Sequence, residues 1–238
     1  MKKFITTVAF IALSTFSAKA IDLPAMPDLG IFSVTVGTAA NSGVFGASAT
    51  QTNNNDDGTQ FSKMKEHGVF ADGFQTGFVE LGIGKHIAFG YDKALGDIST
   101  PENKSREDVG VRAGNLTKVS VDFKDLTTVY AKLNIPTTNV YVKVGRHDTT
   151  MDVKKSGGSA SVYNDVETSG SSVGIGYAKS IRDTGFAIRV EGNYLEFDNV
   201  KSQSNGANTT AGGGNNIVDG SDLKGVVGKV GITYTFGG

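Results

Sequence analysis

The chain of 238 residues contains no cysteine and no tryptophan, and only 4 prolines. The absence of cysteine excludes a disulfide scaffold, a zinc–thiolate site, a catalytic thiol and the lipid-carrying cysteine of a lipoprotein. Lysine and arginine total 23 against 24 aspartates and glutamates, so the basic excess of a nucleic-acid-binding protein is missing. A content of 32 glycines without a period of three excludes collagen, and the length permits one large all-β domain.

Long hydrophobic runs are also missing beyond the N-terminal region. No later segment reaches the length of about eighteen apolar residues that a membrane-spanning helix needs, which excludes a helical membrane bundle. A closed membrane barrel stays open as an alternative, because it satisfies its backbone hydrogen bonds internally and exposes only alternate side chains to lipid.

The first twenty residues have the organisation of a secretory signal peptide. Lys2 and Lys3 are followed by an apolar segment, residues 4–16, and by the A-x-A cleavage site Ala18-Lys19-Ala20. The apolar segment is too short for a membrane helix, which needs about 20 residues. We therefore expect Sec export, cleavage after Ala20 and a single mature domain of residues 21–238 outside the cytoplasm.

The mature sequence has a dominant hydrophobic period of two, which predicts β-strands. In residues 224–236, for example, Val226, Val230 and Tyr234 share one face while Lys229 and Thr233 share the other. Eight runs follow this rule and are rich in β-branched and aromatic residues. They are residues 32–37, 79–83, 87–92, 118–133, 140–145, 173–178, 185–194 and 224–236.

The connections between these runs alternate in length. Long polar segments follow the first, third, fifth and seventh runs, at residues 51–67, 100–117, 149–167 and 201–222. Short links follow the others, at residues 84–86, 134–139 and 182–184. This arrangement predicts an all-β fold, an eight-stranded antiparallel up-and-down transmembrane β-barrel with four long external loops and three short periplasmic turns.

In a membrane barrel the apolar face meets lipid and the polar face lines the interior. The polar faces of the runs carry charges of both signs, which we expect to form a hydrogen-bonded ionic plug, because an eight-stranded barrel is only wide enough for side chains. These charges are Glu80, Asp122, Lys124, Lys143, Arg189, Glu191 and Lys229. The alternative is a soluble periplasmic β-protein with the same charges on its outer surface.

Two further patterns fit a narrow membrane barrel. Glycines gather on the expected inner face, among them Gly37, Gly90 and Gly176, where they would make room for large side chains, although a general glycine bias is an alternative. Aromatic residues lie toward both ends of the runs, which predicts two interfacial belts. The expected loop-end belt consists of Phe78, Tyr91, Phe123, Tyr194 and Phe197.

The signal peptide, the eight alternating strands and the one-sided long loops resemble the small OmpA/OmpX-type outer-membrane β-barrels of Gram-negative bacteria. In that family the barrel-assembly machinery reads alternating apolar residues and a terminal aromatic in the last strand. Val230, Ile232, Tyr234 and Phe236 match this pattern, although Gly237 and Gly238 follow the aromatic residue. The resemblance implies a location in outer-membrane lipid, and we expect a monomer.

The search for chemistry finds no catalytic, metal or cofactor site. The three histidines, His67, His86 and His147, are far apart, and only His147 beside Asp148 is a candidate for a lipid hydrolase at the barrel rim. Residues 53–58 match half of a calcium loop, but position twelve of that frame is Met64 instead of glutamate. We therefore expect no enzyme.

The expected function is structural or that of a surface receptor or adhesin. Loops held by a rigid scaffold commonly carry recognition, so residues 51–67 and 201–222 are predicted to bind an external protein, a phage or another surface ligand. The alternative is a narrow porin-like channel for small solutes.

Overall fold

The computed structural model describes residues 30–54, 60–106, 116–156, 162–182, 184–205 and 217–237. The predicted signal peptide and its cleavage site lie outside the described residues. Among the residues that are described, no helix is long and apolar enough to cross a bilayer. The described strands are β1 (Phe32–Asn54), β2 (Gln60–Ile83), β3 (Ile87–Ala94), β4 (Ile98–Ser99), β5 (Asn103–Arg106), β6 (Leu116–Asn134), β7 (Val140–Ser156), β8 (Val162–Tyr163), β9 (Val166–Ser180), β10 (Phe186–Phe197), β11 (Val200–Asn205) and β12 (Ile217–Gly237).

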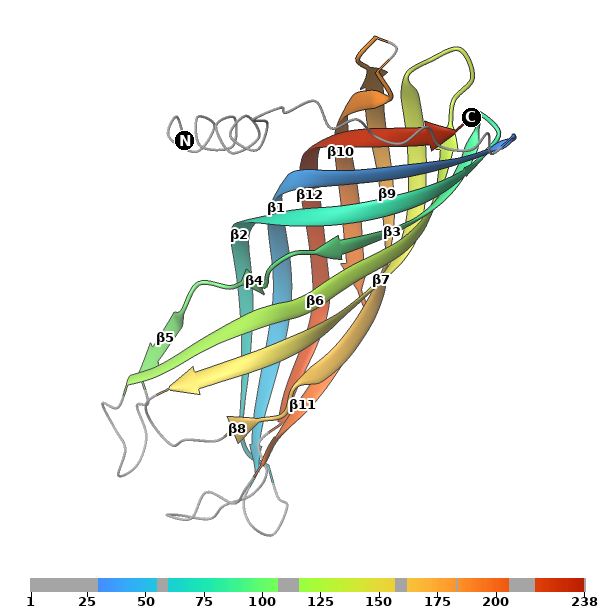
Figure 1. Cartoon of the computed structure of the whole chain (residues 1–238). Coiled ribbons are helices and arrows are strands. Elements are labelled where there is room, and N and C mark those ends of the chain that lie inside the picture. Colours follow the sequence, from blue (N-terminus) through green and yellow to red (C-terminus); the bar gives the residue numbers. More distant parts are fainter. Residues whose placement is uncertain are drawn as a thin grey trace.

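Eight of these strands form a closed antiparallel ring (Figure 1). The order is β1-β2-β3-β6-β7-β9-β10-β12, and β12 pairs with β1 along most of its length to close the ring. The short strands β4 and β5 pair with β6, whereas β11 pairs with β12 and β8 with β11. The predicted eight-stranded up-and-down fold is confirmed.

Three short connections join neighbouring strands at one end of the ring, as predicted. The first link turns at Gly84, whose φ of 60° favours glycine, and the Gly84 amide donates to the Ile31 carbonyl at 2.7 Å. Gly185, with a φ of 76°, ends the link before β10. The link between β6 and β7 holds a hydrogen bond from the Thr138 amide to the Ile135 carbonyl at 3.2 Å.

At the other end the strands are much longer than the sequence predicts. β1 has 23 residues and β2 has 24, whereas about 9–11 residues suffice to cross a bilayer. The described parts of the four expected long loops are largely strand, which corrects those loop boundaries. Residues 55–59, 107–115, 157–161 and 206–216 of these loops lie outside the described residues.

The outer surface of the ring carries an apolar band at the end of the short turns. On β10 the outward side chains run from Phe186 to Tyr194, nine residues, which matches the roughly 9–11 residues of a tilted membrane strand. Val144 on β7 is 58% exposed on this surface and Val226 on β12 is 60% exposed. Ion pairs lie at the edge of the band that faces the long-strand end, such as Lys224 with Glu196 at 3.2 Å. Such a surface is suited to lipid, so we treat these strand segments as membrane-spanning.

The expected aromatic belt at the loop end is wrong for three residues. Phe78, Phe123 and Phe197 are buried inside the ring. Phe78 and Phe197 alternate in step with the inward charges of their strands. Phe123 turns inward because β6 has a β-bulge between Lys124 and Thr127, which reverses the faces of the strand beyond it.

Candidate functional site

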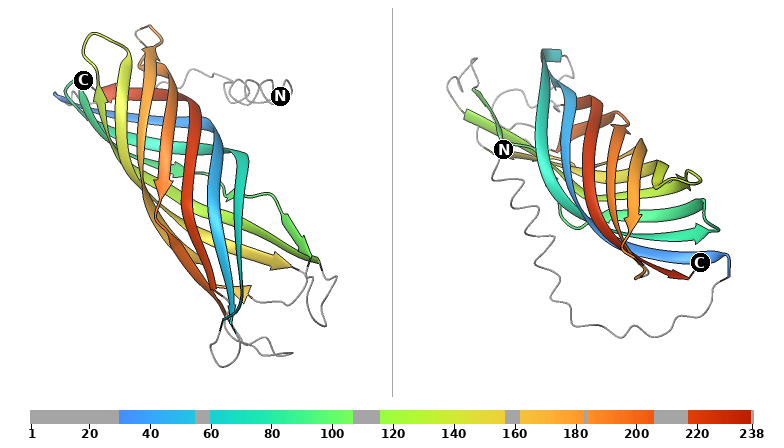
Figure 2. Two further views of the ribbon diagram at one scale, coloured as in Figure 1. Left: turned by 180° about the vertical axis from the view of Figure 1, so that it is seen from behind. Right: turned by 90° about the horizontal axis from the view of Figure 1, so that it is seen from above.

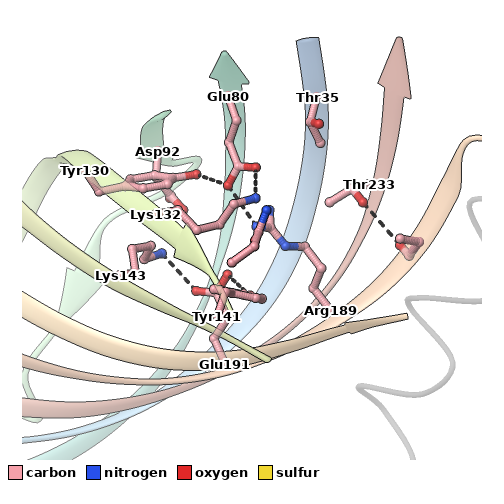
Figure 3. A network of polar contacts seen from close by, with 12 residues as sticks. Thr35, Glu80, Asp92, Tyr130, Lys132, Tyr141, Lys143, Arg189, Glu191 and Thr233 are labelled. Carbon is pink, nitrogen blue, oxygen red and sulfur yellow. Dashed lines mark hydrogen bonds and ion pairs between the residues drawn. The ribbon is translucent and has the colours of Figure 1, made fainter. Parts of the chain in front are cut away.

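The interior of the membrane-spanning ring holds two carboxylates, each surrounded by donors from other strands (Figure 3). Glu80 on β2 accepts hydrogen bonds from Arg189 of β10 at 2.9 Å and from the Tyr130 hydroxyl of β6 at 2.8 Å. Lys132 of β6 also pairs with Glu80, whose carboxylate is therefore fully enclosed by cations and hydroxyl donors. The Glu80 residue is only 2% exposed. Such pairing offsets the desolvation cost of a buried charge.

The second carboxylate is Glu191 on β10. It accepts hydrogen bonds from the Tyr141 hydroxyl at 2.6 Å and from Lys143 at 2.8 Å, both on β7. A further ion pair joins Lys229 of β12 to Asp92 of β3, two strands that are not neighbours in the ring. Together with the Glu80 group, these residues form what we call the lumen network, which links β2, β3, β6, β7, β10 and β12.

Cation–π contacts tie the two carboxylate groups together. The Arg189 guanidinium lies 4.9 Å from the Tyr141 ring centroid and 5.2 Å from that of Phe78. Lys143 lies 4.3 Å from the Tyr130 ring. These contacts make the lumen network one continuous layer across the barrel interior.

Five of the seven charges singled out from the sequence belong to this layer, namely Glu80, Lys143, Arg189, Glu191 and Lys229. Sequence reasoning did not single out four further members, Asp92, Tyr130, Lys132 and Tyr141. The period of two places Asp92 and Lys132 on the polar face, so that signal could have found them. The same period places Tyr130 with Lys132 and Tyr141 with Lys143, but aromatic residues are expected on the lipid side, so the tyrosines are not assigned to the interior from sequence.

Asp122 and Lys124 lie apart from the lumen network, beyond the apolar band. Asp122 pairs with Lys154, and Lys124 pairs with Asp152 at 2.6 Å, both across β6 and β7. The hydrogen bond from Lys154 lowers the pKa of the Asp122 carboxyl, while the hydrogen bond to Asp152 raises the pKa of Lys124. These two pairs belong to the extramembrane part of the sheet.

Glycines opposite the tyrosines make the lumen network sterically feasible. A Cβ atom on Gly90 would lie 2.3 Å from the Tyr130 ring, and one on Gly176 would lie 2.2 Å from the Tyr141 ring. Both distances are far shorter than a carbon–carbon contact of about 3.5–4.0 Å. A side chain at either position would therefore displace the tyrosine ring that faces it.

On the side of the lumen network that faces the long-strand end, the interior is apolar. The apolar cluster contains the stacked rings of Phe45 and Phe70, whose centroids are 5.1 Å apart, and continues to Phe123 at 6.0 Å from Phe70. These rings surround a small cavity together with Ile98, Leu126 and Phe197. The apolar cluster and the lumen network thus close the interior in two successive layers.

The structure separates the histidine candidates. His147 points inward, is fully buried and packs on Phe197 with ring centroids 4.3 Å apart. Asp148 points to the opposite face and accepts a hydrogen bond from Ser169 at 2.6 Å, so the two do not form a catalytic dyad. His67 lies apart from both and contacts the Ser48 hydroxyl at 2.8 Å.

The structure also locates the other candidates of the sequence. In the described ranges no group of three or more potential metal-ligating side chains is present. Most of the partial calcium loop, residues 55–58, lies outside those ranges, whereas Met64 is part of β2. The predicted assembly residues Val230, Ile232, Tyr234 and Phe236 lie on β12 beside the closing strand β1. Tyr234 makes edge-on ring contacts with Phe186 at 4.7 Å and Phe236 at 4.6 Å.

No family model matches the chain, and no curated protein sequence matches it. Among solved structures, the outer membrane protein OprG from Pseudomonas aeruginosa is similar, with 13% identity, 83% of this chain and 96% of that chain covered, and a TM-score of 0.51. AlkL, an outer membrane protein solved in DMPC lipid bilayers, has 12% identity over 91% of this chain and 96% of its own, with a TM-score of 0.48. The outer membrane protease OmpT from Escherichia coli has 7% identity over 85% and 97%, with a TM-score of 0.42. At such identities the likeness to OprG shows the fold, and this chain has the eight-stranded antiparallel fold of outer-membrane β-barrels.

Proposed function

We propose that the protein is a monomeric outer-membrane barrel that acts as a surface-interaction scaffold and does not conduct solutes. The observation that carries this proposal is the length of the strands. β1 and β2 have more than twice the residues that a bilayer crossing requires, so half of each strand extends a paired sheet beyond the lipid. A rigid projecting sheet is suited to presenting a recognition surface.

The sequence pattern supports an outer-membrane location that is reached by export and barrel assembly. The signal peptide of residues 1–20 would direct Sec export, and the last strand would be read by the barrel-assembly machinery, as in the OmpA/OmpX-type proteins that the chain resembles. The apolar band facing outward supports a lipid environment. External proteins, phages or other surface ligands are the proposed partners.

The closed lumen supports a non-conducting barrel over the alternative of a narrow solute channel. The lumen network and the apolar cluster fill the interior at successive levels, and the buried charges are already paired. Single-channel recording in planar bilayers tests this point. We expect no conductance steps from the native chain, whereas regular steps at neutral pH would favour the channel.

The surface role is tested on whole cells that express the protein. Replacing residues 55–59 and 206–216 with Gly-Ser sequences of the same length keeps the described strands intact. We expect these cells to lose attachment to immobilised host proteins or adsorption of phage, whichever the native chain supports. Unchanged attachment and adsorption, with equal amounts of folded barrel on the surface, would contradict the binding role predicted for residues 51–67 and 201–222.

A further inference from the structure

The wall of the barrel splits on the extramembrane side between β2 and the strands that follow β3. β3 pairs with β2 only over Thr76–Ile83, although β2 begins at Gln60. β4 and β5 then pair with β6 and not with β2. Figures 1 and 2 show β5 diverging from β2 in views from opposite sides. We call the gap between residues 60–75 of β2 and residues 98–106 the β2–β5 slit.

The β2–β5 slit widens in steps away from the membrane. At its base the Leu95 amide donates to the Gln75 carbonyl at 2.9 Å, a direct backbone contact. Next, the Ser99 amide donates to the Asp72 carboxylate at 3.0 Å, so one side chain spans the gap. Farther out, Asn103 donates to Glu66 at 3.1 Å, and two side chains are needed to span it.

The slit is widest at the level of the Glu66–Asn103 bridge, where an additional strand would enter. Neighbouring strands in a sheet lie about 4.7–4.9 Å apart, so two strands that flank a third lie about 9.6 Å apart. At the Glu66–Asn103 bridge, two side chains in series separate the two backbones, and a strand would enter at this level once the bridge opens. Both flanking edges lack a strand partner among the described residues at this level.

The edge of β2 presents regularly spaced backbone groups to the slit. The Gln75 carbonyl faces the slit, and the β1–β2 register is regular between Ser62 and Gln75. Backbone direction alternates along a strand, so every second residue presents both its N–H and C=O groups to the slit. These residues are Lys63, Lys65, His67, Val69, Ala71 and Gly73, and of their N–H groups that of Gly73 already donates to the Asp72 carboxylate at 2.8 Å. Such an open edge is a template for an added strand.

The side chains on β2 indicate which strand would fit. Lys63, Lys65 and His67 are exposed on the outer face, and the six slit-facing residues include no acidic side chain. On the inner face, Phe70 and Phe74 pack against the apolar cluster. An added strand with acidic residues outward and apolar residues inward would therefore match the outer face at Lys63, Lys65 and His67 and the inner face beside Phe70 and Phe74. The two carboxylates of that inner face, Glu66 and Asp72, are those that form the side-chain bridges across the slit.

We propose that the β2–β5 slit binds an extended peptide segment of an external protein, which adds as a strand to the open edge of β2 and alternates acidic and apolar residues. The Asp72–Ser99 and Glu66–Asn103 bridges would open to admit it. This inference rests on the proposed surface role and names its partner class.

The test uses the full chain in detergent micelles and a fluorescein-labelled octapeptide of alternating valine and glutamate, followed by fluorescence anisotropy. We expect saturable binding. The same peptide N-methylated at alternate residues keeps its side chains but loses the hydrogen bonds of one edge, and we expect its affinity to fall at least about tenfold. A valine–lysine repeat should also bind more weakly because it faces Lys63 and Lys65.

Two variants test whether the peptide binds in the β2–β5 slit. Val69→Pro removes an N–H that faces the slit at a position where an edge strand tolerates proline, and we expect at least about a fivefold loss of affinity. The double variant Glu66→Cys/Asn103→Cys, joined by a short bifunctional methanethiosulfonate reagent, should not bind until a reductant releases the link. The native chain has no cysteine, so the reagent acts only at these positions. Faster migration of unboiled samples on a gel verifies that each barrel is folded.

The proposal is overturned if the valine–glutamate peptide does not bind, or if it binds equally well when N-methylated or when the slit is closed. It is also overturned if the native chain is a dimer that Val69→Pro converts to monomers, because the edge would then join two copies. None of these outcomes depends on the whole-cell assay, so the surface role can survive the loss of this inference.

Discussion

Arg189 donates a hydrogen bond to Glu80 across the barrel interior at 2.9 Å, joining two residues that lie 109 positions apart in the chain. Both side chains are almost completely buried. A charge pair in this setting is held by its partners, because either member alone would be a buried charge without compensation. The pair therefore links β2 and β10, which are not neighbours in the ring.

Replacing Glu80 with glutamine should destabilise the barrel strongly. The variant leaves Arg189 and Lys132 buried without a counter-charge, and breaking a buried pair in this way costs about 3–5 kcal/mol. The free energy of unfolding in guanidinium chloride, followed by tyrosine fluorescence, measures the effect. The matched control is Glu196→Gln, which breaks the exposed pair with Lys224 and should cost less than about 1 kcal/mol. Similar losses for both variants would contradict this account of the lumen network.

Replacing Gly176 with alanine should destabilise the barrel through a steric clash. The new Cβ would lie 2.2 Å from the Tyr141 ring, so the ring must move away from Glu191, at a cost of about 1–3 kcal/mol. The control is Gly192→Ala, whose Cβ would meet no atom within 4 Å. In a double-mutant cycle, Tyr141→Ala should remove most of the penalty. A full penalty in the Tyr141→Ala background would show that the clash is not the cause.

The eight strands, their antiparallel order and the short turns follow from the sequence, because alternation within residues 224–236 or 185–194 reports directly on one lipid-facing surface. The extramembrane strand halves do not follow. Beyond Phe45 of β1 and Phe70 of β2 most residues on both faces of these strands are polar, so a period of two no longer distinguishes strand from loop. Lys63, Lys65 and His67 share a strand face that only the pairing with β1 reveals.

The composition of the candidate site was partly predictable. Alternation puts Glu80 and Arg189 on polar faces, but their pairing depends on how far each strand is shifted around the ring. The bulge in β6 is the clearest failure of periodicity. Asp125 adopts a φ of 51° there, which is rare outside glycine. The residues around Asp125 form no pattern that predicts the bulge.

The pair formed by Asp122 and Lys154 should make the extramembrane sheet sensitive to acid. The pKa of Asp122 is lowered from its ordinary value of 3.8, first by the hydrogen bond from Lys154. A lowered folded-state pKa means that the ionised carboxylate stabilises the fold above the unfolded pKa, and that this contribution is lost as the pH falls through the folded pKa. The carboxyl carbon shift of Asp122 in an NMR titration measures the pKa. Lys154→Met should raise it toward 3.8, and an unchanged midpoint would contradict the assignment.

Replacing Phe236 with alanine should reduce assembly in cells more than stability in vitro. Phe236 packs edge-on against Tyr234 on the outer surface and lies opposite Val34 at the seam between β12 and β1. If the assembly machinery reads this strand end, less folded barrel should reach the outer membrane. Refolding of the purified variant into detergent should proceed almost as for the native chain. An equal defect in both measurements would indicate a purely structural role for Phe236.

The most direct test of the account is the environment of spin labels attached to single cysteines in the reconstituted protein. Labels at Val144 and Val190, on the apolar band, should collide readily with dissolved oxygen and poorly with a water-soluble nickel chelate. A label at Lys154, on the extramembrane sheet, should show the reverse. If Val144 and Val190 instead favour the nickel chelate, water and not lipid surrounds the band, and the barrel does not span a membrane as described.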